Sequence, residues 1–283
     1  MVRVVARDRR DLLGEGLWWS VREQAVYWVD IIGRQLNRLL LDGEVVASWP
    51  LPEMTGWVIE REDAPGFIAG TQSGFVTLAL DPFRIAPLAD PEAHLPLNRM
   101  NDALADASGA IWAGTMPVAG DTRTGALYRL ARDGTVTTAD TGYTIANGPA
   151  ISLDGGTFYH TDTAARTIYA FAINDDGSLG PRRAHIVFEP AWGNPDGMTI
   201  DAEGGLWVAH WGAGCVSRFD PEGGRERDIA LPASQITNCV FAGADLDRMF
   251  VTSAADGVDE PLGGALFEVD PGVRGLPPHR YRG

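Results

Sequence analysis

The sequence predicts an all-β protein, a six-bladed β-propeller with four antiparallel strands in each blade. Two observations carry this prediction: short strand-like runs recur along the whole chain, and their repeats begin 41 to 49 residues apart. A period of about 40 to 50 residues with four strands per unit is typical of a propeller blade. No sustained apolar stripe at helical spacing interrupts the pattern. The alternative fold, a β-sandwich, gives no reason for so regular a spacing.

Each repeat is marked by a polar residue at a fixed distance before a large hydrophobic residue. The offset is 11 residues for Asn101, Asn147 and Asp196, and 12 residues for Glu15 and Asn238. The repeats begin near positions 15, 56, 101, 147, 196 and 238. Six units of this kind predict six blades in a single domain that spans residues 1–283.

Two strands are recognisable in most repeats, because β-branched and aromatic residues alternate with Gly, Asp, Asn and Pro turns. Examples of the earlier strand are 25–30, 66–70, 110–114 and 205–209. The later strand follows a turn, at 35–39, 74–78, 125–130, 167–171, 214–219 and 264–269. The last repeat is one strand short. We expect the alternating run Arg3–Arg7 to complete it and close the ring, which removes two exposed sheet edges.

Composition narrows the class of partner. The formal charge is −15, from 23 basic and 38 acidic residues, and it argues against nucleic acid or an anionic membrane as a partner. No segment approaches the roughly 18 apolar residues of a membrane span, and the first residues do not read as a signal peptide. The two cysteines, Cys215 and Cys239, form no CxxC motif, so we expect reduced thiols in the cytoplasm. The oligomeric state is not predicted.

The repeated polar residues point to a cation site. In a propeller the first strand of each blade lines the central channel, so residues just before those strands lie at one mouth. We therefore expect Glu15, Asn101, Asn147, Asp196 and Asn238 to point into one shallow basin. Carboxylate and amide oxygens suit Ca²⁺, Mg²⁺ or Mn²⁺, and suit Fe²⁺ or Zn²⁺ less well. Singly, such residues are also ordinary turn formers; their shared register favours the cation site.

Other catalytic signatures are missing from the sequence. It contains no Gly-x-Ser-x-Gly elbow, no His-Glu-x-x-His, no P-loop and no Gly-x-Gly-x-x-Gly after a strand. The five histidines show no metal-ligand spacing. His160 and His210 follow corresponding strands of neighbouring repeats, and we expect them to be ordinary strand residues.

Four short motifs occur in an order that matches one protein family. They are Gly14-Glu15-Gly16-x-x-Trp19, Asn98-Arg99-x-Asn101-Asp102, Asn147-Gly148 and Pro195-Asp196-Gly197. Together they resemble the senescence-marker, gluconolactonase and luciferin-regenerating family, and the resemblance runs through the whole chain. It implies a six-bladed propeller with one divalent metal ion at the channel mouth and an activity on sugar lactones.

The resemblance also implies roles for individual residues. Glu15, Asn147 and Asp196 match the three metal ligands, with Ca²⁺, Zn²⁺, Mn²⁺ or Fe²⁺ as the ion. Arg99 and Asn101 match the pair that binds substrate.

At one position the chain departs from the family. A further acidic residue often follows the segment that is 114–116 here, but Ala119 stands at that position. Asp121, two residues later, is the expected substitute for substrate binding. The departure affects the contacts to sugar hydroxyls and therefore the preferred sugar.

The chemistry expected of such a site is metal-dependent hydrolysis of an aldonolactone to the aldonic acid, within a sugar oxidation pathway. A lactone is an activated ester, so a metal that polarises its carbonyl or activates water is sufficient help. Asp196 is the expected catalytic base, and Arg99 can donate hydrogen bonds to ring or hydroxyl oxygens.

Three alternatives stay open. The first is a calcium-binding regulatory propeller without turnover, which the presence of Arg99 and Asn101 disfavours because pure metal binding does not need them. The second is an interaction propeller that uses its broad faces, which the convergence of polar residues on the channel disfavours. The third is hydrolysis of another ester or an organophosphate by the same site. Neither the metal nor the ring size of the lactone is predicted.

Overall fold

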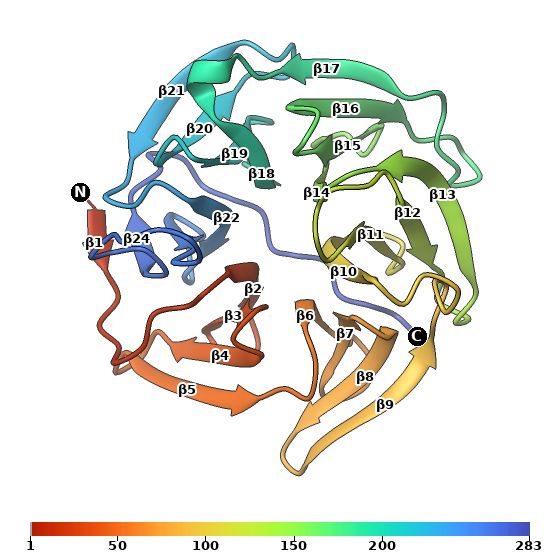
Figure 1. Cartoon of the computed structure of the whole chain (residues 1–283), viewed down its shortest axis with the longest axis horizontal. Coiled ribbons are helices and arrows are strands. Elements are labelled where there is room, and N and C mark those ends of the chain that lie inside the picture. The colour runs from red at the N-terminus through yellow and green to blue at the C-terminus, as the bar shows by residue number, and fades with distance from the viewer. Residues whose placement is uncertain (1) are drawn as a thin grey trace.

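The structure is a computed structural model that describes residues 2–283. Its strands form six four-stranded antiparallel sheets, which stand around a central axis as a ring (Figure 1). This confirms the predicted six-bladed β-propeller. Apart from strands, the described residues hold one short 3₁₀ helix, η1 (Pro190–Trp192). No helix among them is long and apolar enough to cross a bilayer.

The blades follow one another in chain order. Blade 1 is β2 (Gly14–Ser20), β3 (Ala25–Asp30), β4 (Gln35–Leu40) and β5 (Val45–Pro50). Blade 2 is β6 (Thr55–Glu60), β7 (Phe67–Thr71), β8 (Gly74–Leu80) and β9 (Phe83–Ala89). Blade 3 is β10 (Asn98–Ala105), β11 (Ile111–Pro117), β12 (Gly125–Leu130) and β13 (Val136–Tyr143).

The second half of the ring repeats this order. Blade 4 is β14 (Ala146–Ile151), β15 (Thr157–Asp162), β16 (Thr167–Ala172) and β17 (Arg183–Val187). Blade 5 is β18 (Asn194–Ile200), β19 (Leu206–Trp211), β20 (Cys215–Phe219) and β21 (Arg225–Ala230). Blade 6 is β22 (Ile236–Ala242), β23 (Arg248–Ser253) and β24 (Leu266–Val269), completed by β1 (Val2–Val4).

The ring closes between the two ends of the chain, as predicted. Strand β1 pairs antiparallel with β24, with Val2 opposite Val269 and Val4 opposite Phe267. The closing strand is Val2–Val4, shorter than the predicted run 3–7. Its partner β24 would otherwise be an open sheet edge, so this pairing protects blade 6 from pairing with other chains.

Burial falls from the axis to the rim of each blade. In blade 2 every residue of the first strand, β6, is buried, whereas no residue of the fourth strand, β9, is. The first strands contact their counterparts in neighbouring blades, so they are enclosed on both faces. This is why side chains on the first strands, including polar ones, are held away from solvent.

Every first strand carries a register irregularity near its start. The shifts lie at Glu15/Trp18, Thr55/Trp57, Met100/Ala103, Asn147/Ala150, Pro195/Met198 and Ile236/Asn238. A bulge re-aims the neighbouring side chains and leaves peptide groups outside the regular ladder. The repeated polar residues therefore lie at bulges inside the first strands, which corrects the expectation that they precede those strands.

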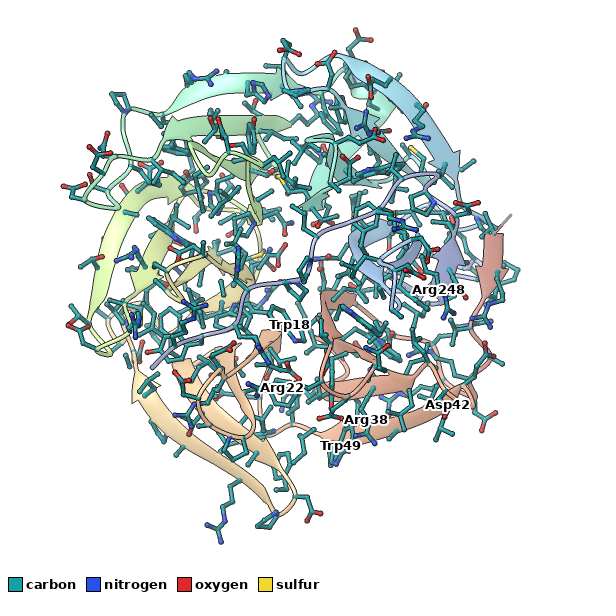
Figure 2. The ribbon with its side chains drawn as sticks, turned by 180° about the vertical axis from the view of Figure 1, so that it is seen from behind. Trp18, Arg22, Arg38, Asp42, Trp49 and Arg248 are labelled. Carbon is teal, nitrogen blue, oxygen red and sulfur yellow. The ribbon has the colours of Figure 1, made fainter. Side chains whose placement is uncertain are left out.

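The opposite mouth of the channel is crossed by the end of the chain (Figure 1). This C-terminal strap, residues 274–283, bonds to turns that follow the first strands of four blades. Its backbone pairs with Ala202, Leu246, Glu60, Glu62 and Gly109. Between the strap and five of the first strands lies a cavity of about 420 Å³. Trp18, near the middle of the ring, is one of its lining residues (Figure 2).

Candidate metal and substrate site

The structure brings the five repeated polar residues together at the start of five first strands. Glu15 lies on β2, Asn101 on β10, Asn147 on β14, Asp196 on β18 and Asn238 on β22. Each is at most 5 % exposed, so the expected shallow basin is instead a buried cluster. We call these five residues, together with Arg99 and Asp102, the channel cluster.

One half of the channel cluster is a chain of hydrogen bonds across three blades. Asn101 Nδ2 donates to Asn147 Oδ1 at 2.9 Å, and Asn147 Nδ2 donates to Asp196 Oδ1. Arg99 begins the chain, because its Nη1 donates to Asn101 Oδ1 at 2.5 Å and to the carbonyl of Met100 at 3.0 Å. The predicted substrate pair is thus bonded directly to a predicted metal ligand.

The other half is organised by Asn238. Its Nδ2 lies 3.3 Å from Glu15 Oε2 and 3.3 Å from Asp102 Oδ2. Glu15 Oε2 also accepts the backbone N–H of Gly16 at 3.2 Å. Asn238 therefore joins the carboxylates of two different blades.

Asp102 is the residue that sequence reasoning left without a role. It is 6 % exposed, and its Oδ1 accepts the backbone N–H of Ala103 at 2.8 Å. Adjacent residues of a regular strand point to opposite faces, which would separate Asp102 from Asn101. The bulge between Met100 and Ala103 removes that alternation, so both side chains join the channel cluster.

Burial controls the charge of the cluster. It raises the pKa of Glu15 to about 8, helped by the negative charge of Asp102. Burial also raises the pKa of Asp102 to about 6. The pKa of Asp196 is raised well above its usual range by burial and by the charges of Glu15 and Asp102. Burial lowers the pKa of Arg99 to about 10, opposed by Glu15 and Asp196.

The donor set fits a hard divalent cation. Three buried carboxylates face a single guanidinium, so three negative charges and one positive leave a deficit of two positive charges when all are ionised. Within residues 2–283, no three His, Cys, Asp or Glu side chains are placed to hold a metal ion by themselves. A site here therefore needs an amide oxygen, and Asn147 Oδ1 keeps one lone pair beyond its bond to Asn101. Oxygen-only ligands of this kind favour Ca²⁺, Mn²⁺ or Mg²⁺.

Asp121 is not part of the channel cluster. It lies in the exposed turn between β11 and β12 and makes no hydrogen bond to Arg99 or Asn101 within the part of the chain that the structure describes. Its role toward substrate stays a prediction.

The two strand histidines are buried inside blades. Burial lowers the pKa of His160 to about 3 and that of His210 to about 4, so both rings are neutral. The His160 ring packs edge-on against Tyr143, with 4.6 Å between ring centroids. His210 Nδ1 lies 2.7 Å from the carbonyl of Trp192. These contacts are those of ordinary strand residues, as expected from the sequence.

Comparison with known proteins agrees with this architecture. A family model described as "SMP-30/Gluconolactonase/LRE-like region" matches residues 13–255. The pentonolactonase XacC of Haloferax volcanii is 37 % identical, over 99 % of this chain and 97 % of its own length. Regucalcin of Gallus gallus is 33 % identical, over 100 % of this chain and 98 % of its own.

Solved structures agree as well. The structure of regucalcin from Agrobacterium tumefaciens, described as a calcium-binding protein, superimposes with a TM-score of 0.94 at 30 % identity. It covers 100 % of this chain and 97 % of that one. With the family match spanning residues 13–255 and full-length relatives above 30 % identity, this chain is a member of the SMP-30/gluconolactonase/LRE-like family.

Proposed function

We propose that this protein is a metal-dependent lactonase that hydrolyses a sugar lactone to the corresponding aldonic acid. The observation that carries the proposal is the channel cluster: three buried carboxylates and an amide oxygen beside a buried Arg99–Asn101 pair. Its relative in Haloferax volcanii, a pentonolactonase along its full length, supports a small sugar lactone as substrate. The two cysteines are free and buried, which suits a reducing cytoplasm.

In this proposal Glu15, Asn147 and Asp196 hold one divalent cation. Such an ion supplies Lewis acidity toward an ester carbonyl and makes water more acidic. The raised pKa values of Glu15 and Asp196 support the assignment, because a nearby cation relieves the repulsion that raises them.

Arg99 and Asn101 orient the substrate. An arginine carries five N–H donors, and only Nη1 of Arg99 bonds to other described residues. The remaining donors are available to the ring oxygen or a hydroxyl of a lactone. Asn101 is fixed by its bonds to Asn147 and to the carbonyl of Ala146, so it holds Arg99 in place.

Hydrolysis then needs one proton acceptor. Water adds to the carbonyl carbon of the lactone while one of its protons passes to the carboxylate of Asp196. The ring C–O bond breaks, and that proton returns to the leaving oxygen to give the open hydroxy acid. A raised pKa brings Asp196 closer to the working pH of a general base.

The test follows acid release from glucono-, xylono-, arabinono- and galactonolactone, before and after treatment with a chelator. We expect chelation to abolish the rate on at least one lactone and added Mn²⁺ or Ca²⁺ to restore it. Asp196→Asn should lower kcat/KM by about 100-fold or more, because it removes a ligand charge and the base. Asp121→Asn, at the exposed turn, is the matched control for loss of an acidic side chain and should leave kcat within about threefold. The absence of a metal-dependent rate on all four lactones would contradict the proposal.

A calcium-binding role without turnover is the second candidate. It is favoured by the similarity to two proteins named regucalcin, one of them described as calcium-binding. Calorimetry separates the two functions: tight Ca²⁺ binding by a protein that hydrolyses none of the four lactones would support the second candidate over the first.

A further inference from the structure

The peptide carbonyl just before each proposed metal ligand is bonded to a side chain of the preceding blade. These three carbonyls belong to Gly14, Ala146 and Pro195. The bonds, in that order, are Thr237 Oγ1 to Gly14 O at 2.5 Å, Asn101 Nδ2 to Ala146 O at 2.7 Å, and Thr163 Oγ1 to Pro195 O at 2.7 Å. Each blade that carries a ligand is therefore tied to its neighbour one residue before that ligand.

The arrangement follows the ligands and not the repeat. In the three blades that carry no proposed ligand, the corresponding carbonyls are those of Thr55, Met100 and Thr237. Across residues 2–283, none of these three accepts a side-chain hydrogen bond from another blade. Met100 O is bonded only to Arg99 of its own strand. Symmetry of the propeller alone would have produced six such bonds.

The bulges explain why the bonds are needed. A bulge leaves peptide groups outside the ladder, and the shifts in β2 and β18 begin at Glu15 and Pro195. A side-chain donor from the next blade supplies the missing partner and fixes the peptide plane that precedes the ligand. Both threonines are buried, with Thr163 7 % and Thr237 0 % exposed, so water does not compete for these carbonyls.

Each threonine hydroxyl has a second partner that holds its proton in this direction. Thr163 Oγ1 accepts Asn147 Nδ2 at 3.1 Å while donating to Pro195 O, so one hydroxyl joins two proposed ligands. The Thr237 oxygen lies 2.9 Å from the hydroxyl of Thr252, which leaves its own proton for Gly14 O.

We propose that Thr163 and Thr237 are positioning residues of the metal site: they set its affinity by fixing the backbone in front of Asp196 and Glu15. This inference rests on the proposed metal-dependent function. Neither hydroxyl touches substrate, so the threonines should govern how tightly the metal binds and have little effect on turnover once the site is full. Partners that orient metal ligands typically change affinity about 10- to 100-fold when they are removed.

The test titrates Mn²⁺ into chelator-stripped protein by calorimetry. Thr163→Val and Thr237→Val remove the hydroxyl at nearly constant volume, and each should weaken binding by about tenfold or more. The double variant should show roughly the product of the two effects, because the threonines hold different ligands. Thr163→Ser and Thr237→Ser keep the hydroxyl and should bind within about threefold of the wild type. At saturating Mn²⁺, kcat of all these variants should stay within about threefold.

The matched control is Thr71→Val in blade 2, which carries no ligand. Thr71 is 2 % exposed, and its hydroxyl donates to Gly74 O at 3.1 Å within the same blade. Its loss should lower the melting temperature of the stripped protein and leave Mn²⁺ affinity unchanged.

Two results would overturn the inference: wild-type affinity in both valine variants with a melting temperature lowered as in Thr71→Val, or serine variants as weak as the valine ones. Where a valine variant does not fold, the alanine variant of the same residue is judged by the same criteria. Failure of the proposed function is read separately on wild-type protein. If it binds no divalent ion, the site and its positioning residues fall together; if it binds Mn²⁺ but hydrolyses no lactone, the affinity test still decides.

Discussion

At the scale of single residues, the site is a store of unfavourable charge. Glu15, Asp102 and Asp196 are buried together, and one guanidinium, that of Arg99, opposes them. Burying carboxylates without full compensation costs free energy. The protein therefore gives up stability in its metal-free state to keep a cation site, as functional sites commonly do.

The sequence predicted three of these residues well and one not at all. The common register marked Glu15 and Asp196, because each repeat brings its first strand to the channel at the same height. Asp102 was hidden by the rule of alternation, which a single bulge suspends. Where a bulge falls depends on the packing of neighbouring first strands, and that packing cannot be read from one strand.

Stability of the stripped protein should fall as pH rises. The pKa of Glu15 is near 4.5 when unfolded and about 8 when folded. The folded state therefore holds the proton more tightly, and stability is lost as pH rises through that interval. Urea unfolding in chelator should show Glu15→Gln gaining about 3 kcal/mol over the wild type near pH 8 and little at pH 4.5. If the variant and the wild type lose stability equally with rising pH, Glu15 is not the titrating group.

At the scale of elements, the offset of 11 residues has a structural cause. In blades 3 and 5, five residues separate the site residue from an aspartate in the turn, and six more lead to a tryptophan on the second strand. The two sets are Asn101, Asp106 and Trp112, and Asp196, Asp201 and Trp207. In both turns the aspartate Oδ2 accepts the indole N–H of the tryptophan at 2.8 Å.

The same aspartates organise the turn itself. Asp201 Oδ1 accepts the backbone N–H groups of Glu203 and Gly205 at 2.9 and 2.8 Å. The turn, the strand length and the buried indole are thus linked through one carboxylate. This is why the sequence could show six equivalent units before any fold was known: the spacing records the length of the first strand plus an aspartate turn.

Asp201→Ala should cost more stability than Asp106→Ala. Asp201 Oδ2 is 2.7 Å from Nε of Arg218, whose side chain is 10 % exposed, whereas Asp106 is 4.0 Å from the more exposed Arg129. Leaving a mostly buried guanidinium without its closest partner costs about 3 to 5 kcal/mol. The looser pair in blade 3 should cost about 1 to 2 kcal/mol. Urea unfolding of both variants gives the comparison, and equal losses would show that the guanidinium contact is not the cause.

At the scale of the whole molecule, the ring is held shut twice. Strand β1 completes blade 6, and the C-terminal strap crosses the mouth opposite the channel cluster (Figure 1). The first closure could be predicted, because the last repeat lacks a strand and the N-terminal run alternates. The strap could not, because it shows no strand pattern and takes its hydrogen bonds from turns of four separate blades.

Tyr281 anchors the strap, and its loss should destabilise the fold without harming the site. It is 2 % exposed, its hydroxyl donates to the carbonyl of Ala131 at 3.0 Å, and its backbone pairs with Glu60 and Glu62. Tyr281→Ala should cost about 3 kcal/mol and Tyr281→Phe about 1 kcal/mol. Thermal unfolding and lactone assays on the same samples provide the check. A variant that keeps wild-type stability, or one that loses activity below its melting transition, would contradict this role.

The most direct measurement is an anomalous difference map from crystals of the wild-type protein soaked in Mn²⁺. The account predicts one strong peak inside the ring, within coordination distance of side-chain oxygens from blades 1, 4 and 5, and no such peak in crystals of Glu15→Gln. An empty cluster in the soaked wild type, or a peak held by other residues, would contradict it.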